Sequence, residues 1–355
     1  MRQEKYRFIA NTEDVPCDET SDPQALPADP VVSVQMVTYN HEQYIARSIE
    51  GVLSQETTFP IELIVGEDCS TDRTRDIVMN YQRNHPAVIR VVTSKKNVGM
   101  RKNGRRTELK CRGKYIAFLD GDDYWHDPGK LQRQVDYLES HPECGMVCTN
   151  ADSVDVSNGK RSTNAIPHRP ELCDTEDSYI ELLTGARIIW PLTACLRKQL
   201  MDEIRETCPE VSDFTLLMGD TQRFLEIAHR SAIHYMPLST ATRNLLPESA
   251  TRSSNIEKKA RFLSCGAGII LHYLDKYPVP QRYDKQVRAW VLKRELYYAY
   301  RCLDIEKARN AYKALRQHDI SIPGKDRLYY YGATNQLINR ITKQIYSFRR
   351  MLISG

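Results

Sequence analysis

Short apolar runs alternate with amphipathic segments along the first part of the chain. Four runs, each bounded by turn residues, have the length and composition of buried parallel strands: residues 31–37, 59–68, 88–94 and 114–120. Ile45, Ile49 and Val52 recur at helical spacing after the first run, and residues 69–85 have the pattern of a loop that opens a second helix. This alternation predicts an α/β domain with a mostly parallel central sheet.

The composition is that of an ordinary globular protein. Hydrophobic residues make up 41% and charged residues 27% of the 355 positions, which excludes a mainly disordered chain. The N-terminus is charged rather than apolar, and no run approaches about 18 uninterrupted apolar residues, so we expect neither a signal peptide nor a transmembrane helix. The ten cysteines include no C-x-x-C pair. We therefore expect reduced thiols, no zinc site and a cytoplasmic location.

The charge is divided unevenly along the chain. Residues 281–355 carry 16 Lys and Arg against 6 Asp and Glu, whereas residues 1–280 carry 34 against 40. The segment 255–355 has a helical pattern and ends in an apolar stripe flanked by basic residues: Ile338, Ile341, Ile345, Phe348 and Leu352, with Arg340, Lys343, Arg349 and Arg350. The stripe predicts either a peripheral contact with an anionic membrane, on the inner face of the plasma membrane, or a helix docked on the protein itself.

Polar side chains follow three of the expected strands. The first strand ends in Thr38-Tyr39-Asn40, the second in Glu67-Asp68 and the fourth in residues 120–123, Asp-Gly-Asp-Asp. Ligands of such sheets bind beyond the carboxyl ends of the strands. The first strand is followed by neither a G-x-G-x-x-G nor a G-x-x-x-x-G-K-[ST] motif, which argues against a dinucleotide-binding or P-loop protein.

The two acidic strand ends each allow two interpretations. Three carboxylates within residues 120–123 repel one another unless a cation offsets them, and oxygen ligands suit Mg²⁺ or Mn²⁺; the alternative is a solvated turn. Asp68 can accept hydrogen bonds from a base or a ribose, while Ser70 or Thr71 caps the helix that follows.

Four blocks in this order and spacing resemble the nucleotide-binding half of a family 2 glycosyltransferase: VSVQMVTYNHEQYI, IELIVGEDCSTDRTRDIV, NVG and GKYIAFLDGDDYW. The resemblance is closest to a bacterial subgroup of that family. It implies the GT-A fold, a nucleotide-sugar donor and a divalent metal held by a D-x-D motif. The resemblance covers roughly residues 31–150 and implies a catalytic domain at 31–250, while composition and pattern predict a polar lead-in at 1–30 and a basic helical region at 255–355. Residues 31–150 would form the nucleotide-binding half and residues 151–250 the acceptor half.

The resemblance also implies roles for individual residues. The metal, Mn²⁺ or Mg²⁺, is expected on Asp122, with Asp120 near the ribose. The other expected nucleotide-binding positions are Thr38, Tyr39, Asn40, Asp68, Asn97, Gly99, Asn103 and Arg106. Arg106 either helps to neutralise the diphosphate or is a surface arginine.

The second half of the catalytic unit carries fewer motifs. Inverting members of the family need a general base, which the family places as an Asp in an E-D or G-D pair at the start of a helix. Gly219-Asp220 matches this pair; the alternative role for Asp220 is an N-cap. Trp125, Trp190 and Thr193 are expected on the acceptor side, although packing is an equal alternative for Trp125.

The sequence thus predicts a metal-dependent, inverting hexosyltransferase. It would move a single sugar from a nucleotide-diphosphate sugar, with UDP expected, to a glycan or lipid-linked acceptor of the cell envelope, and would bind no nucleic acid. The rival hypothesis is a catalytically inactive relative that acts as a nucleotide-sugar-binding or scaffold subunit.

Overall fold

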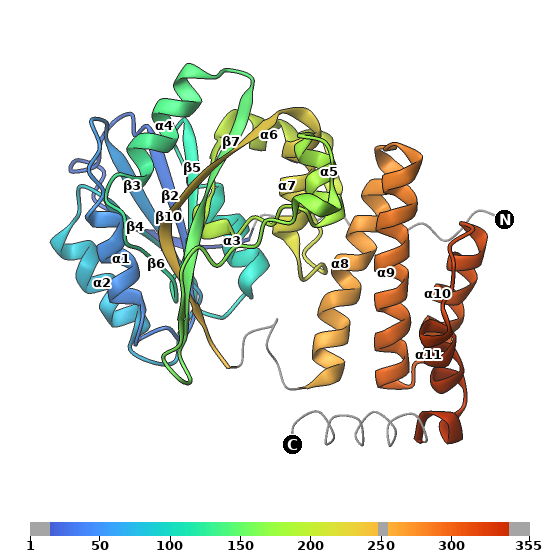
Figure 1. The fold of residues 1–355 in the computed structure, drawn as a ribbon. Helices are drawn as coiled ribbons and strands as arrows, with labels where there is room; N and C mark the ends of the chain where they lie inside the picture. The colour runs from blue at the N-terminus through green and yellow to red at the C-terminus, as the bar shows by residue number, and fades with distance from the viewer. Residues whose placement is uncertain (1–14, 248–254, 341–355) are drawn as a thin grey trace. The chain divides into compact units, whose positions relative to one another are not determined.

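The structure is a computed structural model that describes residues 15–247 and 255–340. The chain divides into two compact units, one of residues 8–246 and the other made up mainly of residues 247–355 (Figure 1). The apolar stripe predicted near the C-terminus lies largely beyond residue 340 and so outside the described residues. None of the described helices is long and apolar enough to cross a membrane.

The first unit is built on one ten-stranded sheet, in the order β1-β4-β3-β2-β5-β9-β7-β10-β6 with β8 paired to β7. Strands β4, β3, β2 and β5 run parallel, which confirms the sheet predicted from the apolar runs. The strands are β1 (Asp18–Thr20), β2 (Val32–Thr38), β3 (Ile61–Glu67), β4 (Ile89–Thr93), β5 (Tyr115–Asp120), β6 (Tyr124–Trp125), β7 (Cys144–Asp155), β8 (Arg161–Ser162), β9 (Cys195–Arg197) and β10 (Ala232–Leu245). Strand β1 falls within the segment expected to be a polar lead-in, where it pairs antiparallel with β4.

Helices cover both faces of this sheet (Figure 1). The helices are α1 (Ile45–Leu53), α2 (Thr74–Asn84), α3 (Met100–Glu108), α4 (Lys130–Ser140), α5 (Ser178–Thr184), α6 (Lys198–Thr207) and α7 (Gly219–Arg230), with short 3₁₀ turns at Pro170–Leu172, Pro191–Thr193 and Pro209–Ser212. Because side chains alternate along a strand, Leu63 packs into the core beneath α1, α2 and α4, whereas Ile64 packs into a second core beneath α6 and α7.

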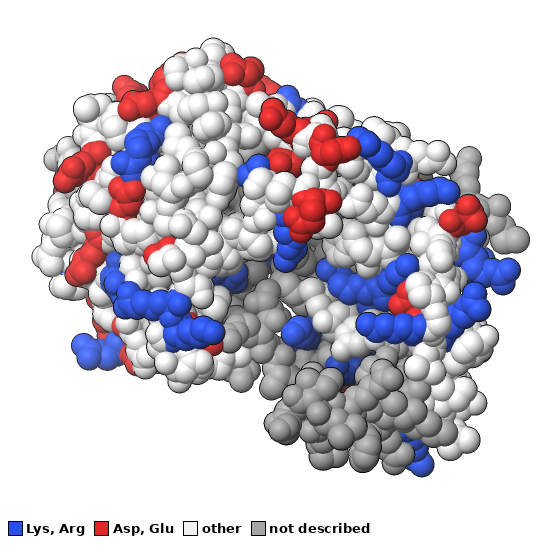
Figure 2. All heavy atoms as spheres, viewed as in Figure 1, with Lys and Arg blue, Asp and Glu red and all other residues white. Residues whose placement is uncertain are grey.

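The second unit consists of helices α8 (Ile256–Lys276), α9 (Gln281–Cys302), α10 (Ile305–Gln317) and α11 (Gly324–Thr334) among the described residues. Its core includes Leu296, Leu315 and Tyr329. The Tyr329 ring lies 5.2 Å from that of Tyr300, centre to centre, so tyrosines pack α11 on α9. Figure 2 shows basic side chains gathered over this unit, in agreement with 17 Lys and Arg against 8 Asp and Glu in residues 255–340.

Candidate functional site

The carboxyl ends of three parallel strands bring the predicted nucleotide-binding residues together. In the sheet register, Thr38 of β2 pairs with Glu67 of β3, and Val37 pairs with Asp120 of β5. Asp68 and the acidic segment that starts at Asp120 therefore lie on either side of the end of β2. This is the edge at which open α/β sheets bind ligands.

The turn after β2 is fastened to the turn after β3. Asn40 has a left-handed backbone (φ 55°), and its side-chain oxygen accepts a hydrogen bond from the Thr71 amide at 2.8 Å. The Asn40 amide in turn donates to Ser70 Oγ at 3.0 Å. Thr38 is buried, and its hydroxyl lies 3.2 Å from Nδ1 of His41. Tyr39 is 41% exposed, so it is the member of this trio whose ring is free to cover a ligand.

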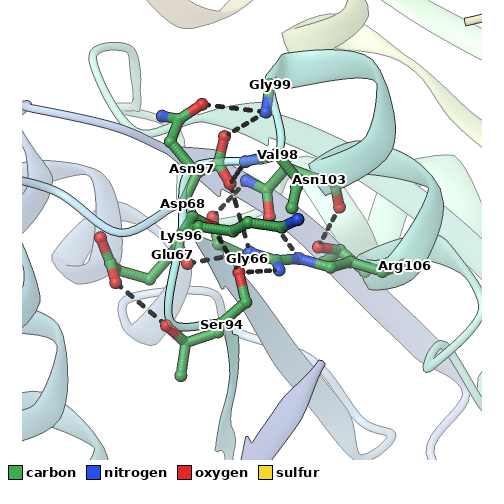
Figure 3. A network of polar contacts seen from close by, with 12 residues as sticks. Gly66, Glu67, Asp68, Ser94, Lys96, Asn97, Val98, Gly99, Asn103 and Arg106 are labelled. Atoms are coloured by element: carbon green, nitrogen blue, oxygen red, sulfur yellow. Dashed lines mark hydrogen bonds and ion pairs between the residues drawn. The ribbon is translucent and has the colours of Figure 1, made fainter. Parts of the chain in front are cut away.

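Asp68 holds the loop that precedes α3. Its two carboxylate oxygens accept hydrogen bonds from the amides of Val98 and Gly99, each at 2.9 Å (Figure 3). Asn97 adds a third contact, because its side-chain oxygen lies 3.0 Å from the Gly99 amide. Gly99 has a φ of 87°, a conformation that residues with a Cβ adopt at a cost. The loop and the end of β3 thus form one rigid corner.

Arg106 and Asn103 lie beneath that corner. The Arg106 guanidinium is buried and donates to Asn103 Oδ1 at 2.9 Å, to Ser94 Oγ at 2.6 Å and to the Glu67 carbonyl at 3.0 Å (Figure 3). It also lies 3.5 Å from Asp68 Oδ1. Burial lowers the pKa of Arg106, and the negative charge of Asp68 offsets part of this effect. Arg106 is therefore neither a surface arginine nor exposed to a diphosphate; it supports Asp68 from below.

Asp120, Asp122 and Asp123 form an acidic cluster in which one carboxylate oxygen from each lies within 4.8 Å of the others. Asp123 is buried, with Oδ1 accepting from the Asn244 amide at 2.8 Å. Burial raises the pKa of Asp123, and the charges of Asp122 and Asp120 raise it further. The Asp120 carboxylate is open to solvent at the cleft, yet the protein atoms around it, with Asp122 and Asp220, raise its pKa to about 7. Hard oxygen donors with uncompensated negative charge fit a divalent cation.

Asp220 lies in the first turn of α7, as predicted, and its side chain is half exposed. The N-cap residue is Met218, so Asp220 does not cap this helix. Its Oδ1 lies 3.7 Å from Arg223 Nη1. Asp120 and Asp220 line the same cleft, which brings the predicted base beside the predicted metal site.

The cleft also contains a basic group that the motifs did not indicate. Arg101 and Arg105 of α3, Arg205 of α6 and Arg223 of α7 all line it. Glu108 lies among them and is hydrogen-bonded by Arg205 and, at 2.8 Å, by Arg223. Burial opposes ionisation of Glu108, but these two arginines hold its pKa below the usual range. The only sequence signal for this group was the run of basic residues in 101–106. That run does not indicate which of its arginines reach the cleft, because this depends on tertiary contacts.

The three residues predicted on the acceptor side have different environments. Trp125 is buried, donates from Nε1 to the Leu192 carbonyl at 2.9 Å and lies under Lys130 Nζ, 4.4 Å from the ring centre. Thr193 is fully buried, and its hydroxyl donates to the Trp190 carbonyl at 2.8 Å. Trp190 is half-buried, with the Arg243 guanidinium 5.0 Å from its ring centre. Trp125 and Thr193 are thus buried, while Trp190 stays partly exposed.

Comparison with known sequences agrees with this geometry. A family model described as glycosyl transferase family 2 matches residues 33–205. An uncharacterized protein of Mycobacterium tuberculosis is 33% identical over 168 residues, which are 47% of each chain. The putative teichuronic acid biosynthesis glycosyltransferase TuaG of Bacillus subtilis is 37% identical over 156 residues, or 44% of this chain and 60% of that protein. The chain spans about half the length of the first of these relatives.

Solved structures show the same fold. Residues 1–349 of TarS from S. aureus, crystallised with UDP, match with a TM-score of 0.61 at 19% identity, over 90% of this chain and 91% of that one. The mannosyltransferase PcManGT from Pyrobaculum calidifontis, in complex with GDP-Man and Mn²⁺, matches with a TM-score of 0.50 at 16% identity, over 92% and 90%. Both the predicted sheet and the predicted fold type are thereby confirmed. Residues 33–205 thus match the model of glycosyl transferase family 2, and the chain shares the GT-A fold of the solved glycosyltransferase TarS.

Proposed function

We propose that this protein transfers a single sugar from a UDP-sugar to an acceptor hydroxyl with inversion at the anomeric carbon. The observation that carries the proposal is the shared cleft of Asp120 and Asp220, together with the acidic cluster around Asp122. A direct displacement requires two groups. A metal held by the acidic cluster after β5 would stabilise the leaving group, and the half-exposed Asp220 carboxylate on α7 would deprotonate the nucleophile.

The nucleotide is proposed to bind along the ends of β2 and β3. Tyr39 is exposed there, and Asn40, Asp68, Asn97 and Gly99 fix the backbone that would surround the base and ribose. TarS, which has the same fold, has been crystallised with UDP and with UDP-GlcNAc. In this chain Asp68 would act through the loop it holds, because both of its oxygens already accept backbone hydrogen bonds.

The metal is proposed to bind to Asp122 and Asp120, with Asp123 oriented behind them by Asn244. When bound, Mg²⁺ or Mn²⁺ would act as a Lewis acid on the departing diphosphate. Arg243, whose positive charge reaches Asp120 and Asp123, would add a second cation near the leaving group.

Asp220 is proposed to accept the proton of the acceptor hydroxyl. It lies in the first turn of α7 with a half-exposed side chain, and Arg223 Nη1 is 3.7 Å from its Oδ1. The acceptor would enter past Trp190. The similarity to TuaG, a putative teichuronic acid biosynthesis glycosyltransferase, supports a cell-envelope glycan as the acceptor class. The basic charge after residue 280 would favour an anionic surface such as the inner face of the membrane.

The test is a transfer assay. Purified protein would be incubated with Mn²⁺ and a panel of nucleotide sugars, with and without a cell-envelope lipid extract, and the products identified by mass spectrometry. Donor turnover that disappears in chelator is expected. UDP binding without turnover of any donor would instead favour the inactive, scaffold interpretation, and absence of UDP binding would refute both.

A further inference from the structure

The cleft beside Asp220 contains a guanidinium group whose charge is poorly compensated. The Arg101 side chain extends from α3 to the start of α7, where it lies against Gly219; a Cβ added to that glycine would come within 1.3 Å of Nη1. Arg101 Nη2 donates only to the carbonyls of Val211 and Asp213, at 3.2 and 3.3 Å, and Nε is buried without a partner. Among the described residues, Arg101 makes no ion pair.

The carboxylates near the cleft compensate the positive charge of Arg101 only in part. Glu108 is the buried carboxylate among them, and both of its oxygens are taken by Arg205 and Arg223. Burial lowers the pKa of Arg101, and the positive charge of Arg223 lowers it further; Asp220, Glu108 and Asp213 offset only part of this. Two guanidinium groups that repel each other in a partly buried cleft are costly unless an anion lies between them.

The cleft also offers unused hydrogen-bonding atoms. Arg223 Nε is buried and has no partner, as is Oε1 of Gln35, a residue only 5% exposed whose Nε2 is held by the Gly104 carbonyl at 2.7 Å. Both side chains line the same cleft as Arg101. Buried polar atoms in native proteins are normally satisfied. The Arg223 donor suits an anion, whereas the Gln35 oxygen is an acceptor and would need a hydroxyl or N–H group on the same ligand.

We propose that Arg101 and Arg223 bind an anionic group, a carboxylate or a phosphate, on one of the two substrates. This rests on the proposed function, since it assigns the chemistry of the sugar or acceptor to the same cleft. Gly219 and Asp220 are consecutive, with Cα atoms about 3.8 Å apart, so the anion lies close to the reacting centre. Because the donor diphosphate is already assigned to the metal and Arg243, the remaining candidates are the carboxylate of a uronic acid donor and a phosphate next to the acceptor hydroxyl.

The position of the Arg101 guanidinium requires a glycine at position 219. Any side chain at that position would displace the Arg101 guanidinium, because the contact leaves no room for a Cβ. Arginine is also suited to the role in a way that lysine is not, since its planar fork can bind both oxygens of a carboxylate or phosphate.

The test compares matched anionic and neutral ligands by isothermal titration calorimetry in Mn²⁺. The donor arm uses UDP-glucuronate against UDP-glucose, and the acceptor arm uses glycerol 1-phosphate against glycerol, with and without UDP. In one arm we expect the anionic ligand to bind at least about tenfold more tightly, the scale of a charge-assisted hydrogen bond. Arg101→Gln should abolish that preference, and Arg101→Lys should restore part of it. The matched control is Arg83→Gln, which removes the same charge from the exposed end of α2.

The outcomes separate this inference from the proposed function. A tenfold preference lost in Arg101→Gln and kept in Arg83→Gln supports it, and the arm in which it occurs identifies the substrate. No preference in either arm of the wild-type protein overturns it, whether or not the variants fold, and so does a preference that Arg101→Gln leaves unchanged. Failure to bind UDP at all would count against the proposed function, while the glycerol titrations without UDP still decide the acceptor arm and free glucuronate against glucose decides the donor arm.

Discussion

Replacing Arg106 by methionine should destabilise the first unit and weaken UDP binding together. Methionine has a similar length but no charge and no donor. The change removes hydrogen bonds to Asn103 Oδ1, Ser94 Oγ and the Glu67 carbonyl, and it leaves the buried Asp68 carboxylate without its nearest cation. Removing one partner of a buried ion pair costs about 3–5 kcal/mol. For a unit of this size each kcal/mol lowers the melting temperature by about 2–4 °C, so a decrease of about 6–20 °C is expected.

The effect on UDP binding follows from the position of Asp68. Without Arg106 the Asp68 side chain loses its neighbour at 3.5 Å and is less firmly positioned, so its hydrogen bonds to the amides of Val98 and Gly99 weaken. The loop that we propose to surround the nucleoside then becomes more mobile. Hydrogen exchange at those two amides should accelerate in Arg106→Met, and the dissociation constant for UDP should rise.

The assay combines thermal unfolding, hydrogen exchange and titration calorimetry on the wild type, Arg106→Met and Arg83→Met. The last variant removes an exposed arginine from α2 and should match the wild type in all three measurements. A melting temperature lowered by less than about 2 °C would refute the structural role of Arg106. Large destabilisation with unchanged UDP affinity would refute the coupling between this buried network and the nucleotide.

Three further changes probe the site and its support. Asp122→Asn should remove most turnover at an unchanged melting temperature, because an amide is a poor ligand for a hard cation; full turnover, or turnover that survives chelator, would contradict the metal role. Asp220→Asn should lower kcat by at least about 10²-fold with unchanged UDP affinity, whereas lost affinity with intact kcat would make Asp220 a donor ligand. Lys130 is fully buried, which lowers its pKa to about 8 from 10.5. Between those pH values the unfolded chain binds more protons than the folded one, so stability rises with pH there and is flat below about 8. Relative to Lys130→Met, the free energy of unfolding of the wild type, measured in urea, should therefore increase by up to about 3 kcal/mol between pH 8 and 10.5. Parallel pH profiles of the two proteins would contradict the lowered pKa of Lys130.

Much of the first unit follows from apolar periodicity, and one helix does not. The runs that became β2 to β5 are almost entirely buried, so their continuous apolar character is easily recognised. Helix α3 gave no such signal, because the face it buries consists of Asn103, Arg106, Thr107 and Glu108. A search for apolar spacing cannot detect a helix whose buried side chains are polar and satisfied by hydrogen bonds.

The site was predictable where it depends on strand ends and not where it depends on the approach of distant helices. Parallel pairing of neighbouring strands is enough to bring Thr38, Asp68 and Asp120 to one edge. The burial of Trp125 depends instead on β6 pairing with β10, where Trp125 lies opposite Ala241. Likewise Arg101 meets the carbonyls of Val211 and Asp213 more than 100 residues further along the chain.

Arg101 and Arg106 show how one basic segment serves two purposes. They are five residues apart on α3, about 140° around the helix at 3.6 residues per turn, so they cannot face the same neighbour. Asn103, Arg106 and Thr107 follow the 3,4 spacing of a single face and lie against the end of β3, where Asn103 donates to the Gly66 carbonyl at 2.7 Å. Arg106 is consequently enclosed and its donors are used within the protein, whereas Arg101 lines the cleft beside α7 and its buried Nε has no partner. The first arginine to be lost in an inactive relative would therefore be Arg101 rather than Arg106, because the hydrogen bonds of Arg106 hold α3 on the end of β3.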